Sequence, residues 1–401
     1  MRLAVAFVFV AACASPPASV ATGAPPSAAA ATASLARVAP APSPTASPAP
    51  SPTASPTPTP VPKPPALTDS PVQSGLRLPW DLAFAPDGRM FVTERAGNVL
   101  VFESGATNAR RIGHFSLPDV RSTGESGLMG IAFDPDFSRN GFLYLCASRV
   151  DEGEFRNQVL RLKVTGNEMA IDGYVIRSGM RAAVAHDGCT VRFGPDGKLW
   201  VSMGDSTVSR LAQDTGSLNG KILRVNTDGS IPPDNPVLPG RSAPSAIWSY
   251  GHRNPQGLAF QPGTGAIFEV EHGADTHDEI NVLEKGANYG WPIVEGPDPQ
   301  HRFTDPVWTS GDVTIANSGA TFVTGQMWGT WSGSLFTAQL KEADLRRYVV
   351  EGTKVTRAEI LLKNRYGRLR SPALGPDGAL YITTSNGSGD RIIRVAATQP
   401  P

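Results

Sequence analysis

A short unit recurs along this chain and restricts its possible folds more than any other feature. The unit is an apolar residue, one further residue, Pro-Asp-Gly, and then apolar and aromatic side chains in alternation. Pro, Asp and Gly favour a tight turn, and the alternation indicates a strand with one buried face. Each unit therefore predicts a β-hairpin. Three copies match the whole pattern, at residues 84–92, 193–201 and 374–382.

Looser copies raise the number of units to six. Two begin at Phe133 and Phe260, and a degenerate one covers 333–337. A third strand is expected after several copies, at 98–102, 221–225 and 391–395. Small sheets that recur about every 50–70 residues are typical of propeller blades. We predict an all-β, six-bladed β-propeller of four-stranded antiparallel sheets, with an irregular β-sandwich as the alternative.

The first 66 residues differ in composition from the rest of the chain. Residues 1–12 combine one basic residue with a short apolar run and small residues, as a signal peptide does. The following Cys13 completes Val-Ala-Ala-Cys, which resembles a bacterial lipobox, although a plain secretory signal is the alternative. Residues 13–66 are mostly Ala, Ser, Pro and Thr, which cannot bury a core.

This composition divides the chain into three parts. We predict a signal peptide at 1–12, a lipidated cysteine with a disordered linker at 13–66, and the propeller domain at 67–398. The protein is then an exported lipoprotein that faces the periplasm or the cell exterior. Its contact with the membrane is expected only through the lipid at Cys13.

Charge and cysteine content narrow the function classes. The 36 basic residues balance the 36 acidic ones, which gives no electrostatic reason to expect a nucleic acid partner. Apart from Cys13, the cysteines are Cys146 and Cys189. One possible pair is not a disulfide framework, and Cys146 lies in an apolar run where a small buried residue fits. We therefore favour two unpaired cysteines.

Four unusual polar residues occupy a similar position in the repeats. In a propeller the opening strand is innermost, so residues just before it lie at one mouth of the central channel, where loops carry function. An acid, an imidazole and two guanidiniums are therefore expected to converge, although each alone could be a solvated loop residue. They are Glu125, His186, Arg253 and Arg370, about four to eight residues before the apolar residue that opens the unit.

The residues around His186 and Arg253 are compatible with a catalytic or ligand-binding role for each. His186 has small neighbours in 185–189, and an accessible imidazole can take a proton from a hydroxyl, although a structural histidine is the alternative. Arg253 lies in a tight loop between a glycine and a proline. Its planar, charged fork suits a carboxylate or a developing oxyanion.

Residues 271–279 could bind a metal ion. Their acids and glycine backbone supply the hard oxygen ligands that calcium takes. His272 and His277 would suit zinc, but no third clustered His or Cys completes such a site. Three cations near the last two blades of a neutral chain imply an anionic ligand; they are Lys341, Arg368 and Arg370.

Several continuous segments resemble one enzyme family. The most specific is Tyr-Gly-His-Arg-Asn-Pro-Gln-Gly-Leu at 250–258. On these segments the chain resembles the soluble glucose/aldose sugar dehydrogenases that depend on pyrroloquinoline quinone (PQQ), over about residues 70–397. The other matching segments are 127–137, 228–236, 278–281 and 288–292.

The resemblance implies a propeller that binds PQQ and Ca²⁺ at the channel mouth and oxidises aldoses at C1 to lactones. It implies that His186 takes the proton of the C1 hydroxyl as hydride moves to PQQ, and that Arg253 stabilises charge on the quinone oxygen. The matching cofactor contacts are Arg253, Asn254, Lys341, Arg368 and Arg370. The matching metal ligands are the Gly273 and Ala274 carbonyls at the cofactor's calcium, and Glu279 with the Tyr289 carbonyl at a structural one. Glu125 and Asp187 are the residues assigned to substrate binding.

The chain also departs from the family pattern. Glu125 replaces a glutamine, Ala185 an aspartate, and Ala274 a proline, while the aromatic residues that cover glucose are missing around 312–314. These changes affect the sugar site more than the cofactor site. Two other functions stay open: a non-catalytic binding module, and a calcium-dependent lactone hydrolase on a similar propeller. The physiological electron acceptor is not predicted.

Overall fold

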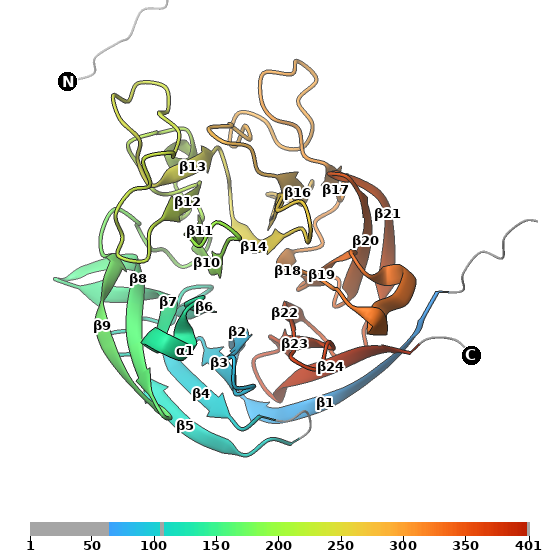
Figure 1. Cartoon of the computed structure of the whole chain (residues 1–401). Helices are drawn as coiled ribbons and strands as arrows, with labels where there is room; N and C mark the ends of the chain where they lie inside the picture. Colours follow the sequence, from blue (N-terminus) through green and yellow to red (C-terminus); the bar gives the residue numbers. More distant parts are fainter. Residues whose placement is uncertain (1–63, 105–107, 399–401) are drawn as a thin grey trace, which may run out of the picture. The chain divides into compact units, whose positions relative to one another are not determined.

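The computed structural model describes residues 64–104 and 108–398. These residues form six four-stranded antiparallel sheets arranged around a central axis (Figure 1). The predicted signal peptide, Cys13 and residues 14–63 of the linker lie outside the described residues. Within the described part, no helix has the length and apolar character needed to cross a bilayer.

The innermost strands form a closed ring around the channel. Each contacts the next, and the last contacts the first. This arrangement confirms the six-bladed propeller and excludes the β-sandwich. The inner strands are β2 (Pro79–Phe84), β6 (Leu128–Phe133), β10 (Gly188–Phe193), β14 (Pro255–Phe260), β18 (Asn317–Phe322) and β22 (Leu369–Leu374).

Three further strands complete each blade outward. The second strands are β3 (Met90–Glu94), β7 (Phe142–Asp151), β11 (Leu199–Met203), β15 (Ile267–Glu271), β19 (Leu335–Gln339) and β23 (Leu380–Thr384). The third strands are β4 (Asn98–Phe102), β8 (Glu154–Thr165), β12 (Lys221–Val225), β16 (Glu279–Val282), β20 (Leu345–Glu351) and β24 (Asp390–Thr398). The outer strands are β5 (Arg111–Ser116), β9 (Glu168–Ile176), β13 (Ile247–Tyr250), β17 (Trp308–Thr309), β21 (Lys354–Leu361) and β1 (Ala66–Leu76).

The repeated unit is the hairpin between the inner and second strands. Its turns close with hydrogen bonds from the amides of Gly88, Gly197 and Gly378 to the carbonyls three residues earlier, at 2.8, 3.0 and 2.9 Å. The degenerate copy at 333–337 lies at the start of β19, in the fifth blade. A 3₁₀ segment at Gln326–Trp331 separates β19 from β18, which explains why this copy lacks the turn. The only α-helix among the described residues is the short α1 (Phe137–Asn140).

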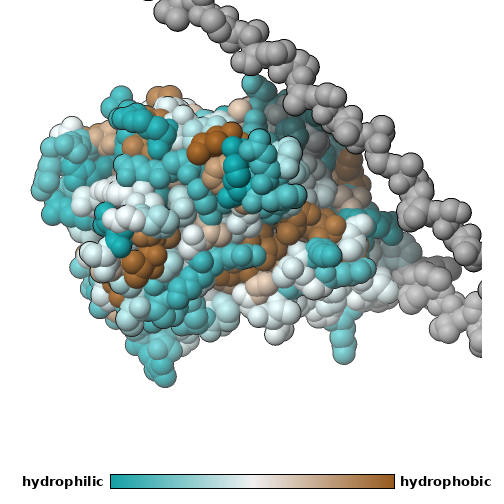
Figure 2. Space-filling view, turned by 90° about the horizontal axis from the view of Figure 1, so that it is seen from above, coloured by the Kyte–Doolittle hydropathy of each residue, from teal (hydrophilic) through white to brown (hydrophobic). Residues whose placement is uncertain are grey.

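The last blade is closed by both ends of the domain. The N-terminal strand β1 pairs with β24, so that Ala66 lies opposite Thr398 and Leu76 opposite Asp390. The ring is thereby closed by main-chain hydrogen bonds. Apolar side chains fill the spaces between blades, and in the side view of Figure 2 apolar patches are bordered by hydrophilic residues.

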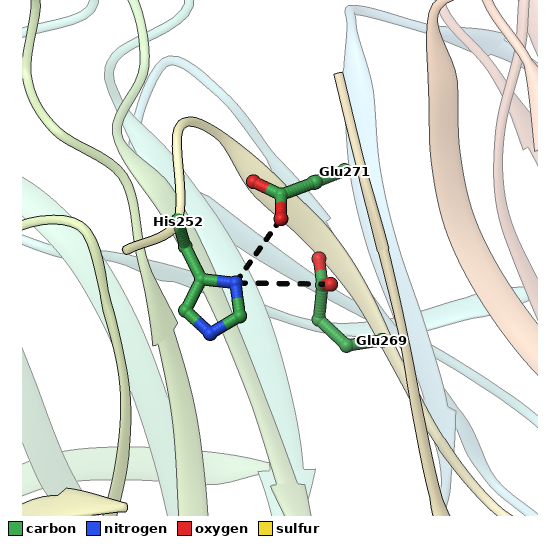
Figure 3. A group of neighbouring side chains, drawn as sticks. All are labelled: His252, Glu269 and Glu271. Atoms are coloured by element: carbon green, nitrogen blue, oxygen red, sulfur yellow. Dashed lines mark hydrogen bonds and ion pairs between the residues drawn. The ribbon is translucent and has the colours of Figure 1, made fainter. Parts of the chain in front are cut away.

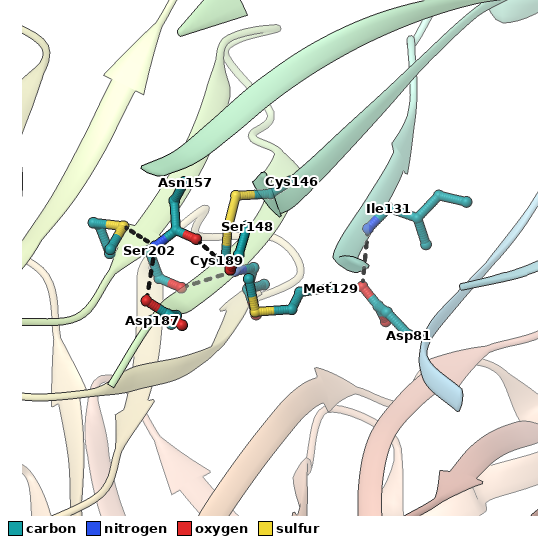
Figure 4. The surroundings of a disulfide bond; sticks show 12 residues. Asp81, Met129, Ile131, Cys146, Ser148, Asn157, Asp187, Cys189 and Ser202 are labelled. Carbon is teal, nitrogen blue, oxygen red and sulfur yellow. Dashed lines mark hydrogen bonds between the residues drawn. A yellow bond between two sulfur atoms is a disulfide. The ribbon is translucent and has the colours of Figure 1, made fainter. Parts of the chain in front are cut away.

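The expectation of two unpaired cysteines is wrong. Cys146 on β7 and Cys189 on β10 form a disulfide across the interface of the second and third blades, with Cα atoms 5.5 Å apart (Figure 4). Both residues are fully buried, as predicted for Cys146. The apolar run indicated burial, but nothing local indicated which side chain of the neighbouring blade Cys146 would face.

Candidate active site

The polar residues predicted to converge lie where the inner strands begin, an end of the channel that we call the upper mouth. Glu125 and His186 stand just before β6 and β10, and Arg253 just before β14. Oε2 of Glu125 accepts hydrogen bonds from the His186 amide, at 3.0 Å, and from Asn254 Nδ2, at 3.2 Å. Loops of three blades therefore meet at one carboxylate.

The charges around Glu125 confirm this proximity. Burial alone would raise the pKa of Glu125, but nearby His272, the His186 amide and Arg370 lower it overall. Arg370, on β22, is almost fully buried, with its guanidinium 3.7 Å from the Trp80 ring centroid. Burial lowers its pKa to about 9, so Arg370 stays charged at neutral pH. An anion and several cations thus share the upper mouth.

His186 is oriented by an acid that the sequence reasoning missed. Its Nδ1 lies 2.8 Å from Oδ1 of the buried Asp205, whose Oδ2 accepts a hydrogen bond of 2.8 Å from Trp291 Nε1. A carboxylate at this position favours the tautomer with the proton on Nδ1, which leaves Nε2 as an acceptor. The sequence contained one signal for Asp205: it is an acid two residues after the end of β11, and that end of the strand lies at the upper mouth.

Asp187 lies beneath this loop rather than facing the mouth. Its side chain is fully buried, and Oδ1 accepts hydrogen bonds from Asn157 Nδ2 and the Ala183 amide, both at 3.0 Å. Burial raises the pKa of Asp187 to about 7. Asp187 therefore has a supporting position next to His186 in the chain, with Asn157 beside it (Figure 4).

Arg253 is held by the segment that follows β15. Its amide donates a 2.7 Å hydrogen bond to Glu271 Oε2, and its guanidinium donates one of 3.2 Å to the His272 carbonyl. The guanidinium also lies 5.4 Å from the Trp291 ring centroid. Since Trp291 also bonds Asp205, one indole contacts both the Arg253 and the His186 sides of the mouth.

The predicted cations of the last two blades approach the same region. Arg368 donates from Nε to the Ser385 carbonyl, at 3.1 Å, and from its guanidinium to the Leu340 carbonyl, at 3.3 Å. Its charge contributes to the lowered pKa of Arg370, whose main cause is burial. Lys341 follows Leu340 directly and is exposed. Arg368 thus links the Lys341 segment to Arg370.

Several buried polar atoms near the mouth have no hydrogen-bond partner in the described protein. Buried donors without acceptors cost free energy, so their concentration here indicates a ligand rich in acceptors. Together with the cations, they fit an anionic ligand. The donors are Nε of Arg95, Nε of Arg253 and Nε2 of Gln256, and Nε2 of His272 joins them in the tautomer that carries its proton there.

Three of the four predicted metal ligands, all except Ala274, line one small cavity next to Arg253. Its walls include Gly273, Glu279, Tyr289 and Glu295. The Gly273 amide donates a 2.9 Å hydrogen bond to Asp278 Oδ1, and the Ala274 amide binds Glu295 Oε1. A Cβ at Gly273 would lie 1.7 Å from the Thr276 carbonyl oxygen, so only glycine fits. These side-chain bonds fix the backbone whose carbonyls were predicted to bind calcium.

A surplus of buried acids borders this cavity. Nδ1 of His252 lies 3.1 Å from Glu271 Oε1 and 3.9 Å from Glu269 Oε2 (Figure 3). Asn281 Nδ2 donates to Glu269, Glu271 and Glu279, at 3.0, 3.2 and 3.1 Å. Burial raises the pKa of Glu279 to about 8, and that of Glu269 well above its usual range, with the charge of Glu271 adding to both.

The buried acids around His252 could bind a cation. Glu269 Oε1 has no donor within the described protein, and buried carboxylates are normally compensated by a proton or a positive charge. Among the described residues, the one group of His, Cys, Asp and Glu side chains close enough to share an ion is His252, Glu269 and Glu271. His272 and His277, weighed for zinc, are not in it.

Comparisons with known proteins agree with this geometry. The profile of the family described as Glucose / Sorbosone dehydrogenase matches residues 76–394. An aldose sugar dehydrogenase of Escherichia coli is 32% identical over 337 residues, which are 80% of this chain and 90% of that protein.

The solved structures that are similar to this chain are also described as sugar dehydrogenases. An oxidoreductase of Thermus thermophilus described as a glucose dehydrogenase is 38% identical, with a TM-score of 0.75, over 82% of this chain and 100% of its own. The PQQ-bound form of an aldose sugar dehydrogenase from Streptomyces coelicolor is 33% identical, with a TM-score of 0.72, over 84% and 100% of the two chains.

Proposed function

The chain belongs to the glucose/sorbosone dehydrogenase family, and from that premise we propose that it oxidises aldose sugars at C1 to lactones, using PQQ and Ca²⁺. The observation that carries this proposal is the convergence of His186, Arg253 and Arg370 on one mouth lined by unpartnered donors. A triacid quinone offers the negative charge and acceptors that these groups lack. When bound, PQQ supplies the two-electron chemistry by accepting a hydride.

His186 is the proposed general base. Asp205 holds Nδ1 as a donor, so Nε2 can accept the proton of the sugar C1 hydroxyl as the hydride leaves C1. Glu125, beside the His186 amide, is the proposed contact to the sugar. The buried Asp187 would support the loop that carries His186.

The cations would bind and polarise the cofactor. Arg253 would offer its fixed positive charge to negative charge on the quinone oxygen, and Asn254 would help to hold the cofactor. Arg370, Arg368 and Lys341 are the proposed carboxylate contacts.

Calcium is proposed at two positions of the segment after β15. The Gly273 and Ala274 carbonyls would bind the ion that polarises PQQ, and Glu279 with the Tyr289 carbonyl would bind a structural one. The surplus of buried acids supports the second position. Glu279→Gln should lower the calcium content of the protein by about one ion relative to Asp275→Asn, a change of an exposed acid in the same loop.

An absorbance titration of the calcium-loaded protein with PQQ tests the whole proposal. We expect binding at micromolar concentration, and PQQ-dependent reduction of an artificial electron acceptor when aldoses are added. Absence of binding would refute it. Binding without sugar oxidation would favour the non-catalytic module, and lactone hydrolysis without PQQ would favour the hydrolase.

We also propose that the protein is exported and anchored by a lipid at Cys13. The support is the signal-like segment, the lipobox-like quartet and the Pro-rich linker. Cys13→Ala should release the protein from the membrane fraction without changing its sugar oxidation. Retention of the variant in that fraction would contradict the anchor.

A further inference from the structure

The disulfide lies directly beneath the proposed catalytic base. Cys189 follows His186 by three residues, and its partner Cys146 belongs to the neighbouring blade. Figure 4 shows the pair between Met129, Ser148 and Ser202, with Asp187 and Asn157 beside it. The cross-link therefore ties the start of β10 to the middle of β7.

The backbone between the base and the disulfide is unusual. His186, Gly188 and Cys189 have φ angles of 61°, 59° and 68°, in the left-handed region that residues with a side chain rarely adopt. Such a conformation persists only where the surroundings hold it. His186 and Cys189 are therefore kept in place by their contacts rather than by local preference.

The non-covalent contacts of this loop come from both neighbouring blades. The His186 amide binds Glu125 Oε2, and the Gly188 amide binds Asn254 Oδ1 at 3.3 Å. The packing is tight, because a Cβ at Gly204 would lie 2.1 Å from the His186 carbonyl oxygen. A Cβ at Gly130 would lie 2.5 Å from the Cys189 carbonyl oxygen. A small displacement of β10 would therefore move the imidazole.

We propose that the Cys146–Cys189 disulfide is a positioning element for His186. It fixes the left-handed loop to the second blade, so that Nε2 stays at the position required for proton transfer. This inference rests on the proposed role of His186. A displacement of about 1 Å in a catalytic group can cost on the order of a hundredfold in rate. Because the hydrogen bonds remain, we expect a smaller loss of about tenfold when the bond is removed.

The test compares the full chain with Cys146→Ala/Cys189→Ala, both loaded with PQQ and calcium and assayed well below their unfolding temperatures. We expect kcat to fall about tenfold, while KM and PQQ affinity stay within about twofold. Hydrogen exchange should accelerate at the amides of residues 186–190 only. The control is Val101→Ala, which removes buried methyl groups in the first blade and lowers stability without touching this loop.

Reduction provides a second arm that needs no variant to fold. The wild-type apoprotein is treated with a thiol reductant until the thiols of Cys146 and Cys189 can be titrated, and the reductant is removed before PQQ and calcium are added. The reduced protein should show the same loss of kcat, and the double alanine variant treated in the same way should be unaffected. An unchanged kcat, with only a lower Tm, would overturn the inference and leave the disulfide as a structural cross-link. An inactive wild type would refute the proposed function instead, and the exchange rates at 186–190 would then decide the inference.

Discussion

The two mouths of the channel are built by opposite ends of the same six inner strands, yet they have different chemistry. At the upper mouth, ionisable residues precede or begin β6, β10, β14 and β22, and Glu125, His186 and Arg253 meet there. At the lower mouth, β2, β6 and β10 end in Phe84, Phe133 and Phe193, which line a cavity of about 360 Å³ together with other side chains that are mostly apolar.

The difference follows from how the strands are connected. The lower ends of β2, β6 and β10 lead into hairpin connections within a blade, and each phenylalanine packs on an aromatic ring of the preceding blade, as Phe193 does on Tyr144 of β7. The upper ends of β6, β10 and β22 receive longer loops from the preceding blade, and loops can carry residues that a packed turn cannot. Along these strands, stability and chemistry are therefore separated.

An ion pair between the two mouths crosses the channel. Arg192 on β10 donates two hydrogen bonds to Asp81 on β2, at 2.7 and 3.1 Å, and Asp81 is almost fully buried. The pair joins the third blade to the first across β6. Changes at the upper mouth should therefore reduce turnover, and changes at this pair should reduce stability.

The largest effect is expected at the upper mouth. His186→Ala removes the proposed base and should lower kcat about a thousandfold, because general base catalysis contributes on the order of 10²–10⁴. PQQ affinity and Tm should stay close to those of the wild type. Steady-state kinetics measures kcat, with a variant of the exposed His114, His114→Ala, as the control. If His186→Ala lowered the Tm and not kcat, turnover and stability would not be separated between the two parts of the channel.

The matching test of the lower part is the channel ion pair. Asp81→Asn leaves Arg192 without its charged partner and should lower the free energy of unfolding by about 3 kcal/mol. Turnover at 25 °C should not change. Denaturant unfolding is the measurement, and Glu103→Gln, in an exposed pair with Arg110, should cost less than about 1 kcal/mol. A fall in kcat at full PQQ occupancy would show that the two mouths are coupled.

A variant of Asp205 tests the orientation of the His186 imidazole separately from its presence at the upper mouth. Asp205→Asn no longer favours the proton on Nδ1 of His186, so kcat should fall about thirtyfold, with PQQ still bound. The loss should be smaller than that of His186→Ala, because the imidazole remains. Asp214→Asn, at an exposed position of the same loop, is the control. Equal activity of wild type and Asp205→Asn would remove Asp205 from the site.

The smallest effect concerns the support beneath the base. Burial raises the pKa of Asp187 from 3.8 to about 7, so the native state binds this proton more tightly than the unfolded chain. Its contribution to stability is complete below about pH 4 and is lost as the pH rises through about 7.

Asp187→Asn carries no such proton. The Tm of the variant relative to wild type should therefore rise by a few degrees between pH 4 and pH 7. Calorimetry at several pH values measures it, with Asp81→Asn as a comparison from the channel pair. A Tm difference that does not depend on pH would show that Asp187 is ionised throughout.

The fold was predictable because its signal is local. A Pro-Asp-Gly turn between an apolar strand and an alternating one is written in nine consecutive residues, and each copy forms the expected hairpin. The fifth blade was harder, since a 3₁₀ segment replaces its turn. The position of His186 and Arg253 at one mouth followed from their place before the inner strands, which is also a local property.

What lies between blades was not predictable in this way. Asp205 belongs to a different loop from His186, and Cys146 to a different blade from Cys189. The acids around His252 come from β15 and β16, and only their common burial makes their charge notable. No pattern along the chain gives these distances.

The sequence by itself thus determined the number of blades, the strands and turns within each, and the residues at each strand end, because these depend on neighbours a few positions apart. Only the tertiary structure decided that Asp205 orients His186, that Asp187 is buried, and that a disulfide joins two blades. Those contacts depend on how the ring closes, and closure places residues that are far apart in the sequence within a few ångströms of one another.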